Sequence, residues 1–354
     1  MMTPDGAVLP SAGPEALHYP DLPIPDPGQV VAGQEGVWWL RMPLPISLDH
    51  INLWLIEEPG GYALVDTGMA TPATRELWER LSATFLKDRP LTRILLTHLH
   101  PDHVGLAAWL QRRFELPLWT SAATMAQLRM LLGETTAPML AQRMAFFAAH
   151  GVEPIEQMRP NLGSKGYQDS VDCLPEATRL MRDAEVTPIG SRQWHWFETG
   201  GHAHGHLCLH AAAPQPVLIA GDQVLPTISP NVGLTPLTPD PNPLATYLAS
   251  LERLSALDAG TLVLPSHGRP FLGLAARATE IRQHHERHMV KLFEACRTPL
   301  TAFQCLPFLY RRPQLGFNLF LAMGEALAHL EYLVCSGQFA RLRENSLTRY
   351  QRLN

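Results

Sequence analysis

Residues 95–103 (LLTHLHPDH) constrain the chain more than any other segment, because they place four side chains capable of binding a metal next to one another. The apolar residues at the start of the segment predict a buried strand. His98 and His100 are two residues apart, so they project to the same side of an extended chain. Asp102 and His103 fall where the next helix is expected to begin. The four side chains are therefore expected to converge within one loop, a pattern typical of a metal site.

Four other short segments stand where a strand is expected to end and a loop to begin. They are residues 65–68 (VDTG), 201–206 (GHAHGH), 219–222 (IAGD) and 265–268 (PSHG). Strand ends from the two halves of a layered α/β protein meet along one edge of the sheets. The histidines and aspartates of these segments are therefore expected to join the first group.

Together, the five segments resemble the ordered motifs of the metallo-β-lactamase superfamily, and the resemblance covers roughly residues 37–275. It implies an α/β fold, the αββα sandwich, with a site for two divalent metal ions. The implied ligands are His98, His100 and His202 for one ion, Asp102, His103 and His267 for the other, and Asp222 as a bridge between them. Asp66 is implied to orient ligands from behind without binding a metal itself.

The segment 201–206 departs from the family pattern. The superfamily usually has Gly-His-Ser/Thr-Pro-x-His here, whereas this chain has His204 where proline is common. We rank His202 above His204 and His206 as the ligand.

The chemistry of such a site follows from its ligands. Oxygen and nitrogen ligands suit Zn²⁺, with Mn²⁺ or Fe²⁺ as alternatives. Two cations roughly 3.5 to 4 Å apart lower the pKa of a water between them to about 7, which gives a hydroxide nucleophile at neutral pH. Asp102 is expected to orient that nucleophile or to accept its proton, and His103 is grouped with Asp102 as catalytic.

Proline content and hydrophobic periodicity divide the chain into three parts. Residues 1–36 are rich in proline and predict an extended arm on the surface. Residues 37–279 alternate strands and helices and form the catalytic domain. Strands are predicted at 37–45, 51–58, 62–66, 91–97, 116–120, 194–198, 207–211, 217–220 and 262–265, and helices at 71–87, 102–114 and 243–257. Residues 280–354 predict a helical unit centred on residues 315–334.

Two of these regions could shape a pocket. Residues 121–185 carry several methionines, which make an adaptable apolar surface, so this stretch predicts either a lid-like wall or ordinary core packing. The methionines are Met125, Met130, Met139, Met144 and Met158. The tail resembles the small winged-helix domain of a superfamily branch that includes a mitochondrial endoribonuclease and bacterial hydrolases.

Charge and cysteine content restrict the partners and the compartment. The net charge of −5 makes a polyanion such as nucleic acid a less expected partner than a small-molecule substrate. The five scattered cysteines form no CxxC pair, which fits reduced thiols in a cytoplasm. Neither a charged leader nor an apolar run of membrane-spanning length is evident, so no membrane association is expected. The sequence specifies no oligomeric state.

The leading functional hypothesis is hydrolysis of an ester, thioester or lactone. One alternative is an endoribonuclease acting on single-stranded RNA, with Arg311, Arg312, Arg341 and Arg343 gripping the backbone. A second alternative is a mono-iron persulfide-type dioxygenase, which the full ligand set disfavours. A third is a metal-binding protein without turnover.

One further histidine run does not belong to the motifs. Residues 284–288 (HHERH) fall one residue short of the zinc motif HExxH. We interpret this run as a solvated helix face.

Overall fold

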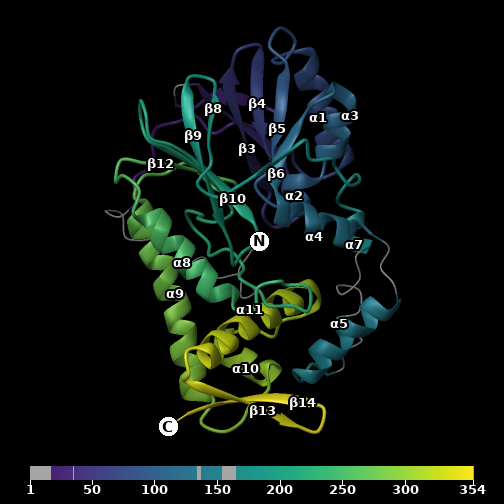
Figure 1. The fold of residues 1–354 in the computed structure, drawn as a ribbon, viewed down its shortest axis with the longest axis vertical. Coiled ribbons are helices and arrows are strands. Elements are labelled where there is room, and N and C mark those ends of the chain that lie inside the picture. The colour runs from purple at the N-terminus through teal and green to yellow at the C-terminus, as the bar shows by residue number, and fades with distance from the viewer. Residues whose placement is uncertain (1–16, 35, 134–136, 154–164, 354) are drawn as a thin grey trace.

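Two β-sheets packed face to face form the upper part of the molecule in the computed structural model, which describes residues 17–34, 36–133, 137–153 and 165–353 (Figure 1). The seven-stranded sheet has the order β1-β2-β3-β4-β5-β6-β7, and the five-stranded sheet has the order β12-β11-β10-β9-β8. The strands of the first sheet are β1 (Val30–Ala32), β2 (Val37–Pro43), β3 (His50–Glu58), β4 (Gly61–Val65), β5 (Leu91–Leu95), β6 (Leu118–Ser121) and β7 (Arg179–Met181). Those of the second are β8 (Val186–Ile189), β9 (Arg192–Thr199), β10 (His206–Ala211), β11 (Val217–Gly221) and β12 (Leu262–Pro265).

The core between the sheets follows from the alternation of side chains along the strands. In β9, Trp194 and Trp196 are buried, whereas His195 between them is exposed. The two tryptophans meet Trp39 and Trp54 of the other sheet in one apolar cluster. Helices α1 (Pro72–Ala83) and α3 (Ala107–Phe114) flank the first sheet, and α8 (Pro243–Ser255) and α9 (Leu274–Ala295) flank the second. The expected αββα sandwich is therefore present.

The segment after β5 forms two helices where the sequence predicted one. The short helix α2 (Pro101–Val104) carries Asp102 and His103 and ends before α3 begins. The helical ladder breaks because the backbone N–H of Leu106 donates to the carbonyl oxygen of Gly68, 3.1 Å away. This bond ties α2 to the loop after β4, where Asp66 lies.

Residues 121–185 form helices α4 (Ala122–Leu132), α5 (Ala137–Ala149) and α7 (Lys165–Gln168), followed by β7. The parallel strand β7 was not predicted. The methionines divide between the two expected roles: Met125 is in the domain core, Met144 packs against the C-terminal core, and Met130 lines a pocket. Met158 lies outside the described residues.

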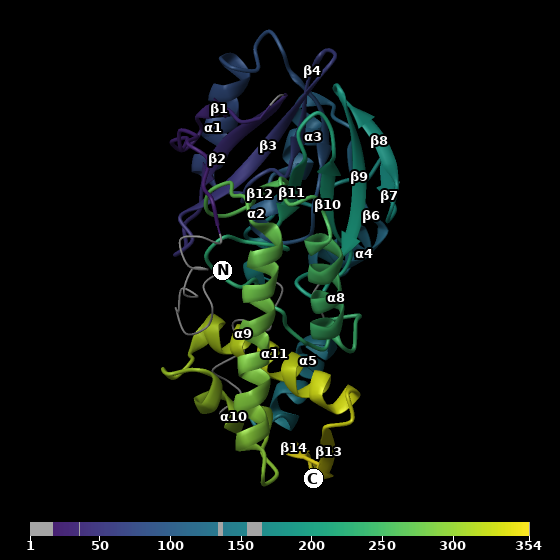
Figure 2. The ribbon, with the colours of Figure 1, turned by 90° about the vertical axis from the view of Figure 1, so that its left-hand side faces the viewer.

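The C-terminal part consists of the end of α9, of α10 (Ala302–Leu309) and α11 (Gly316–Cys335), and of a hairpin formed by β13 (Phe339–Glu344) and β14 (Leu347–Arg352). The long helix α9 runs from the sandwich down into this part (Figure 2). The predicted C-terminal helical region is present, and it is followed by the hairpin, in which Thr348 and Tyr350 are buried at a spacing of two, the period of a strand.

The proline-rich arm is described only from residue 17 onward. Its residues 30–32 form the edge strand β1, and the backbone of His18 pairs with Leu272. Among the described residues, no helix has the length and apolar character that a membrane span requires.

Candidate metal centre

One group of ligand atoms comes from three loops at the edge of the sandwich. His98 and His100 lie between β5 and α2, His202 lies between β9 and β10, and Asp222 directly follows β11. Nδ1 of His100 is 2.9 Å from Nε2 of His98 and 3.1 Å from Nε2 of His202. Oδ2 of Asp222 is 3.4 Å from Nε2 of His202 and 3.9 Å from Nε2 of His98. Four ligand atoms thus surround one point.

A second group lies on the other side of the same aspartate. It combines Asp102 and His103 of α2 with His267, which follows β12. Oδ2 of Asp102 is 3.7 Å from Nε2 of His103 and 3.3 Å from Nε2 of His267. Oδ1 of Asp222 is 3.4 Å and 3.5 Å from the same two nitrogens. The two carboxylate oxygens of Asp222 therefore face different groups, as a bridging ligand requires.

Hydrogen bonds behind the histidines fix which ring nitrogen carries the proton. Nδ1 of His202 donates to the carbonyl oxygen of Asn231, 2.9 Å away, and Nδ1 of His267 donates to that of His50, 2.8 Å away. Nδ1 of His103 donates to Oδ2 of Asp66, 2.7 Å away. Since a carbonyl or carboxylate oxygen only accepts, the Nε2 atoms of these rings present lone pairs to the centre.

His98 has the same orientation through Thr97. The hydroxyl of Thr97 donates to Oδ2 of Asp66 (2.8 Å) and so accepts from Nδ1 of His98 (3.0 Å). Asp66 therefore lies behind both ligand groups, the position that the resemblance implied, and its backbone has φ of 61°.

The charges of the buried groups also fit cations. Burial, reinforced by neighbouring histidines, lowers the pKa of His98 well below its usual value and that of His100 to about 3, so both rings are neutral. Burial alone would raise the pKa of Asp222, but His103 and His267 hold it well below the usual range. Burial alone would lower the pKa of His103, but Asp222, Asp66 and Asp102 raise it well above 6.5, so without a metal this ring takes up a proton.

The residues present fit a pair of divalent metal ions. Within the described part of the chain, three buried atoms of the centre, Nε2 of His103, Nε2 of His267 and Oδ1 of Asp222, have no hydrogen-bond partner. Unpaired buried polar atoms are costly, and metal coordination would satisfy all three. His98, His100, His202 and Asp222 would hold one ion, and Asp102, His103, His267 and Asp222 the other.

The structure distinguishes the three histidines of residues 201–206. His204 is exposed, and only its backbone carbonyl is engaged there, by Gln127. His206 begins β10 and is fully buried, and its Nε2 accepts the backbone N–H of Asp222 at 3.2 Å. That bond uses the Nε2 lone pair, so His206 holds the backbone of Asp222 and is not available as a metal ligand. Sequence reasoning missed this role.

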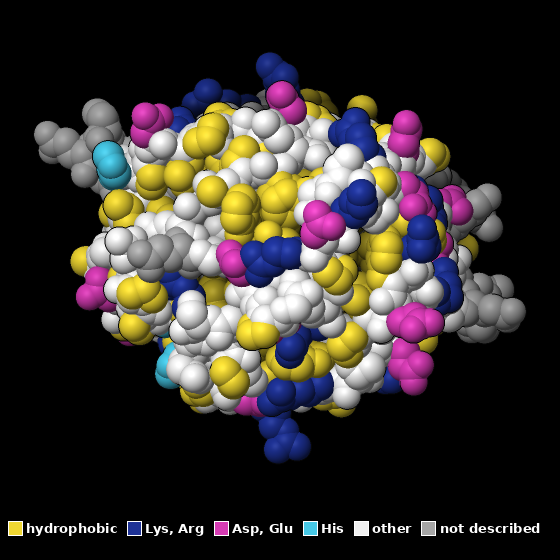
Figure 3. Space-filling model, turned by 90° about the horizontal axis from the view of Figure 1, so that it is seen from above, with side chains coloured by type: hydrophobic (Ala, Val, Ile, Leu, Met, Phe, Trp, Pro, Cys, Tyr) yellow, Lys and Arg dark blue, Asp and Glu magenta, His cyan; other side chains and the backbone are white. Residues whose placement is uncertain are grey.

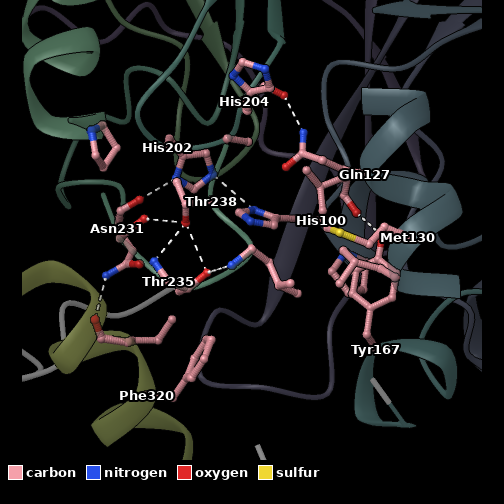
Figure 4. A pocket seen from close by; sticks show the side chains of 18 of the residues that line it. His100, Gln127, Met130, Tyr167, His202, His204, Asn231, Thr235, Thr238 and Phe320 are labelled. Carbon is pink, nitrogen blue, oxygen red and sulfur yellow. Dashed lines mark hydrogen bonds between the residues drawn. The ribbon is translucent and has the colours of Figure 1, made fainter. Parts of the chain in front are cut away.

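A pocket of about 490 Å³ opens onto the centre. His100, Asp102 and His202 are part of its lining, so both ligand groups reach it. Met130 and Tyr167 lie on one side, and Asn231 and Phe320 lie on the other (Figure 4). Phe320 comes from α11, so the C-terminal part forms one wall of the pocket.

The fold and this centre are those of a metallo-hydrolase, and comparison with known proteins supplies the family. The chain belongs to the metallo-β-lactamase superfamily, whose model matches residues 46–267, and a model described as the metallo-beta-lactamase-like C-terminal domain matches residues 289–353.

Three similar proteins illustrate the relationship. A probable metallo-hydrolase of Bacillus subtilis (strain 168) is 27% identical over 326 residues, which cover 84% of this chain and 92% of that protein. An acyl-coenzyme A thioesterase of Homo sapiens is 25% identical over 248 residues, 67% of this chain and 80% of that protein. The crystal structure of a beta-lactamase domain protein from Burkholderia ambifaria has a TM-score of 0.85 and 37% identity, covering 96% of this chain and 98% of that chain.

Proposed function

We propose that this chain is a dinuclear metal-dependent hydrolase, with zinc as the expected metal, that cleaves an ester, thioester or lactone bearing an apolar acyl group. One observation carries the dinuclear assignment: the two oxygens of Asp222 face two separate ligand groups, and the Nε2 lone pairs of four histidines point at them.

When bound, two such cations supply a nucleophilic hydroxide at neutral pH and polarise the carbonyl oxygen of the substrate. The residues of the chain would hold the metal ions and accept the proton of the nucleophile. Burial alone would raise the pKa of Asp102, but His103 and His267 hold it well below the usual range, so its carboxylate is ionised. Asp102 also lines the pocket. Asp102 is therefore placed to accept the proton of the nucleophile, while His103 holds the carboxylate of Asp102 in position.

The acyl group is inferred from the wall of the pocket. Apolar side chains line the pocket from both sides and include Met130, Leu131, Phe147, Phe320 and Leu321. Polar groups are fewer and include Gln127, Thr235 and Thr238. An apolar chain with a carbonyl near the metal centre fits this distribution. The similarity to an acyl-coenzyme A thioesterase supports the same substrate class.

The pocket lining disfavours the ribonuclease alternative. Among its described residues, Arg143 is the only arginine or lysine, and it is buried. Arg311 and Arg312 are exposed between α10 and α11 outside the pocket, and Arg341 pairs with Glu331. Figure 3 views the sandwich end of the molecule, opposite the C-terminal part, and basic and acidic side chains are interspersed on that face. We therefore assign the C-terminal domain to shaping the pocket; its relation to winged-helix domains stays a prediction.

The test is the acyl-chain dependence of hydrolysis by the zinc-loaded and manganese-loaded protein. Phe320→Ala removes part of the apolar wall, so kcat/KM for an octanoyl thioester should fall about 10-fold or more, because burying a phenylalanine side chain contributes about 1.5 to 3 kcal/mol. The value of kcat/KM for an acetyl thioester should change little, because the acetyl group does not reach the wall.

Two variants serve as controls. Phe308→Ala removes a phenylalanine that is 49% exposed on α10 and lies outside the pocket, so its chain-length profile should match the wild type. Asp222→Ala should abolish turnover of every substrate. No hydrolysis of any ester, thioester or lactone would refute the proposal, and RNA cleavage that depends on Arg311 and Arg312 would favour the nuclease.

A further inference from the structure

The histidine run at residues 284–288 is buried, so its interpretation as a solvated helix face is wrong. His284, His285 and His288 are 8%, 0% and 4% exposed. They lie on the face of α9 that meets α11, where Glu325 (3% exposed) and His329 (fully buried) project from the other helix. The three histidines, Glu325 and His329 therefore form one buried polar cluster between the two helices.

Three ligand atoms of this cluster converge. His284 and His288 are four residues apart, so they occupy the same helix face one turn apart. Oε1 of Glu325 is 4.0 Å from Nε2 of His284 and 3.7 Å from Nδ1 of His288, and the three atoms lie within 4.8 Å of one another. Ligand atoms of a tetrahedral zinc ion are roughly 3.4 Å apart, given bonds of about 2.0 to 2.1 Å. The two distances from Glu325 exceed this spacing by roughly 0.3 and 0.6 Å.

The remaining two histidines are already paired and act as supports. Nδ1 of His285 is 3.1 Å from Nε2 of His329, and Nδ1 of His329 donates to the carbonyl oxygen of Glu325 at 2.7 Å. By contrast, Nδ1 of His288 is buried and makes no hydrogen bond among the described residues. Burial and the neighbouring His329 and His284 also lower the pKa of His288, so its ring is neutral and retains a lone pair.

We propose that His284, His288 and Glu325 form a further site for a divalent transition-metal ion, for which zinc is the best match to two imidazoles and one carboxylate. The cation would cross-link α9 to α11. The function of this site is structural, because it lies between two helices and shares no ligand with the dinuclear centre.

The position of Glu325 gives the site a route to the pocket. Nδ2 of Asn231 donates to Oε2 of Glu325 at 3.5 Å, and the backbone oxygen of Asn231 accepts from His202. Phe320 and Leu321 of the same helix line the pocket. A cation at Glu325 would therefore hold the pocket wall and the segment that supports His202.

The test counts zinc in chelator-stripped, reloaded and dialysed full-length protein. The wild type should retain about three equivalents. A triple variant that dismantles the dinuclear centre, His98→Ala/His103→Ala/Asp222→Ala, should retain one equivalent of zinc. Its Tm should still increase when zinc is added. Introducing Glu325→Gln into this triple variant should abolish both the remaining zinc binding and the increase of Tm. In the otherwise wild-type chain, Glu325→Gln should lose one equivalent, while the dinuclear centre retains two.

His150→Gln is the matched control, because it replaces a histidine that is 8% exposed and lies outside the cluster. It should retain all three equivalents. His284→Gln/His288→Gln provides a second loss-of-site variant in case Glu325→Gln folds poorly. The proposal is overturned if the variant without the dinuclear centre binds no zinc, or if folded Glu325→Gln or His284→Gln/His288→Gln protein keeps every equivalent.

Discussion

At the residue scale, the tautomer of each histidine separates ligands from supports. Four histidines donate through Nδ1 to the protein and direct Nε2 at the centre, whereas His206 uses Nε2 to accept from the backbone of Asp222. The sequence motifs could predict the ligand positions, because strand ends and short spacings are local. They could not predict the role of His206, which depends on the pairing of β10 with its neighbours.

His206→Ala should weaken zinc binding at the dinuclear centre by roughly 10- to 100-fold, because the backbone N–H of Asp222 loses its buried acceptor. Competition with a chromophoric chelator measures this. His202→Ala should lose the metal outright, and His204→Ala, which removes an exposed ring two residues away, should bind as the wild type does. Loss of metal in His204→Ala together with full binding in His202→Ala would show that His204, and not His202, is the ligand.

At the element scale, α11 is held against the segment that carries Asn231 by a close approach at Gly324. The backbone N–H of Leu234 donates to the carbonyl oxygen of Gly324 at 2.9 Å, and a Cβ at Gly324 would lie 3.3 Å from Cα of Gly233. The helical period predicted α11 from the sequence. Its contact with residues 231–234 could not be predicted, since it joins segments far apart in the chain. The same limit applies to β7 and the break between α2 and α3, which tertiary hydrogen bonds decide.

Gly324→Val should push α11 away from Gly233 and cost about 1 to 3 kcal/mol in the free energy of unfolding, as overpacking does. Because the pocket wall moves with the helix, KM for long-chain substrates should also rise. Denaturant unfolding and steady-state kinetics check the two effects. An unchanged KM in a destabilised variant would show that the helix does not position the wall.

At the scale of the whole molecule, buried neutral histidines make the fold sensitive to acid. Burial, together with the guanidinium groups of Arg341 and Arg343, lowers the pKa of His150 to about 4, against 6.5 for an ordinary histidine. Between these values the unfolded chain binds the proton and the folded chain does not. Stability is therefore fully present above pH 6.5 and falls as the pH is lowered toward 4.

His150→Gln should flatten this decline by up to about 3 kcal/mol between pH 6.5 and 4, at roughly 1.4 kcal/mol for each unit of pKa. Urea unfolding at a series of pH values measures the slope. The control variant is His204→Gln, which replaces an exposed histidine. Equal slopes for His150→Gln and the wild type would mean that His150 accepts its proton in the folded state as readily as in the unfolded one.

The proposed ligands of the dinuclear centre are spread from His98 to His267, and the ring of His267 is oriented by the carbonyl oxygen of His50. During synthesis, the first loop with its three histidines emerges long before the ribosome has made the partner that completes the second ligand group. A nascent chain therefore presents a partial chelate while residues 104–267 are being made. Because the ligands are spread along the chain, both metal ions can bind only after the two sheets have packed together. Until then, a cation other than the expected one can bind to the histidines of the first loop.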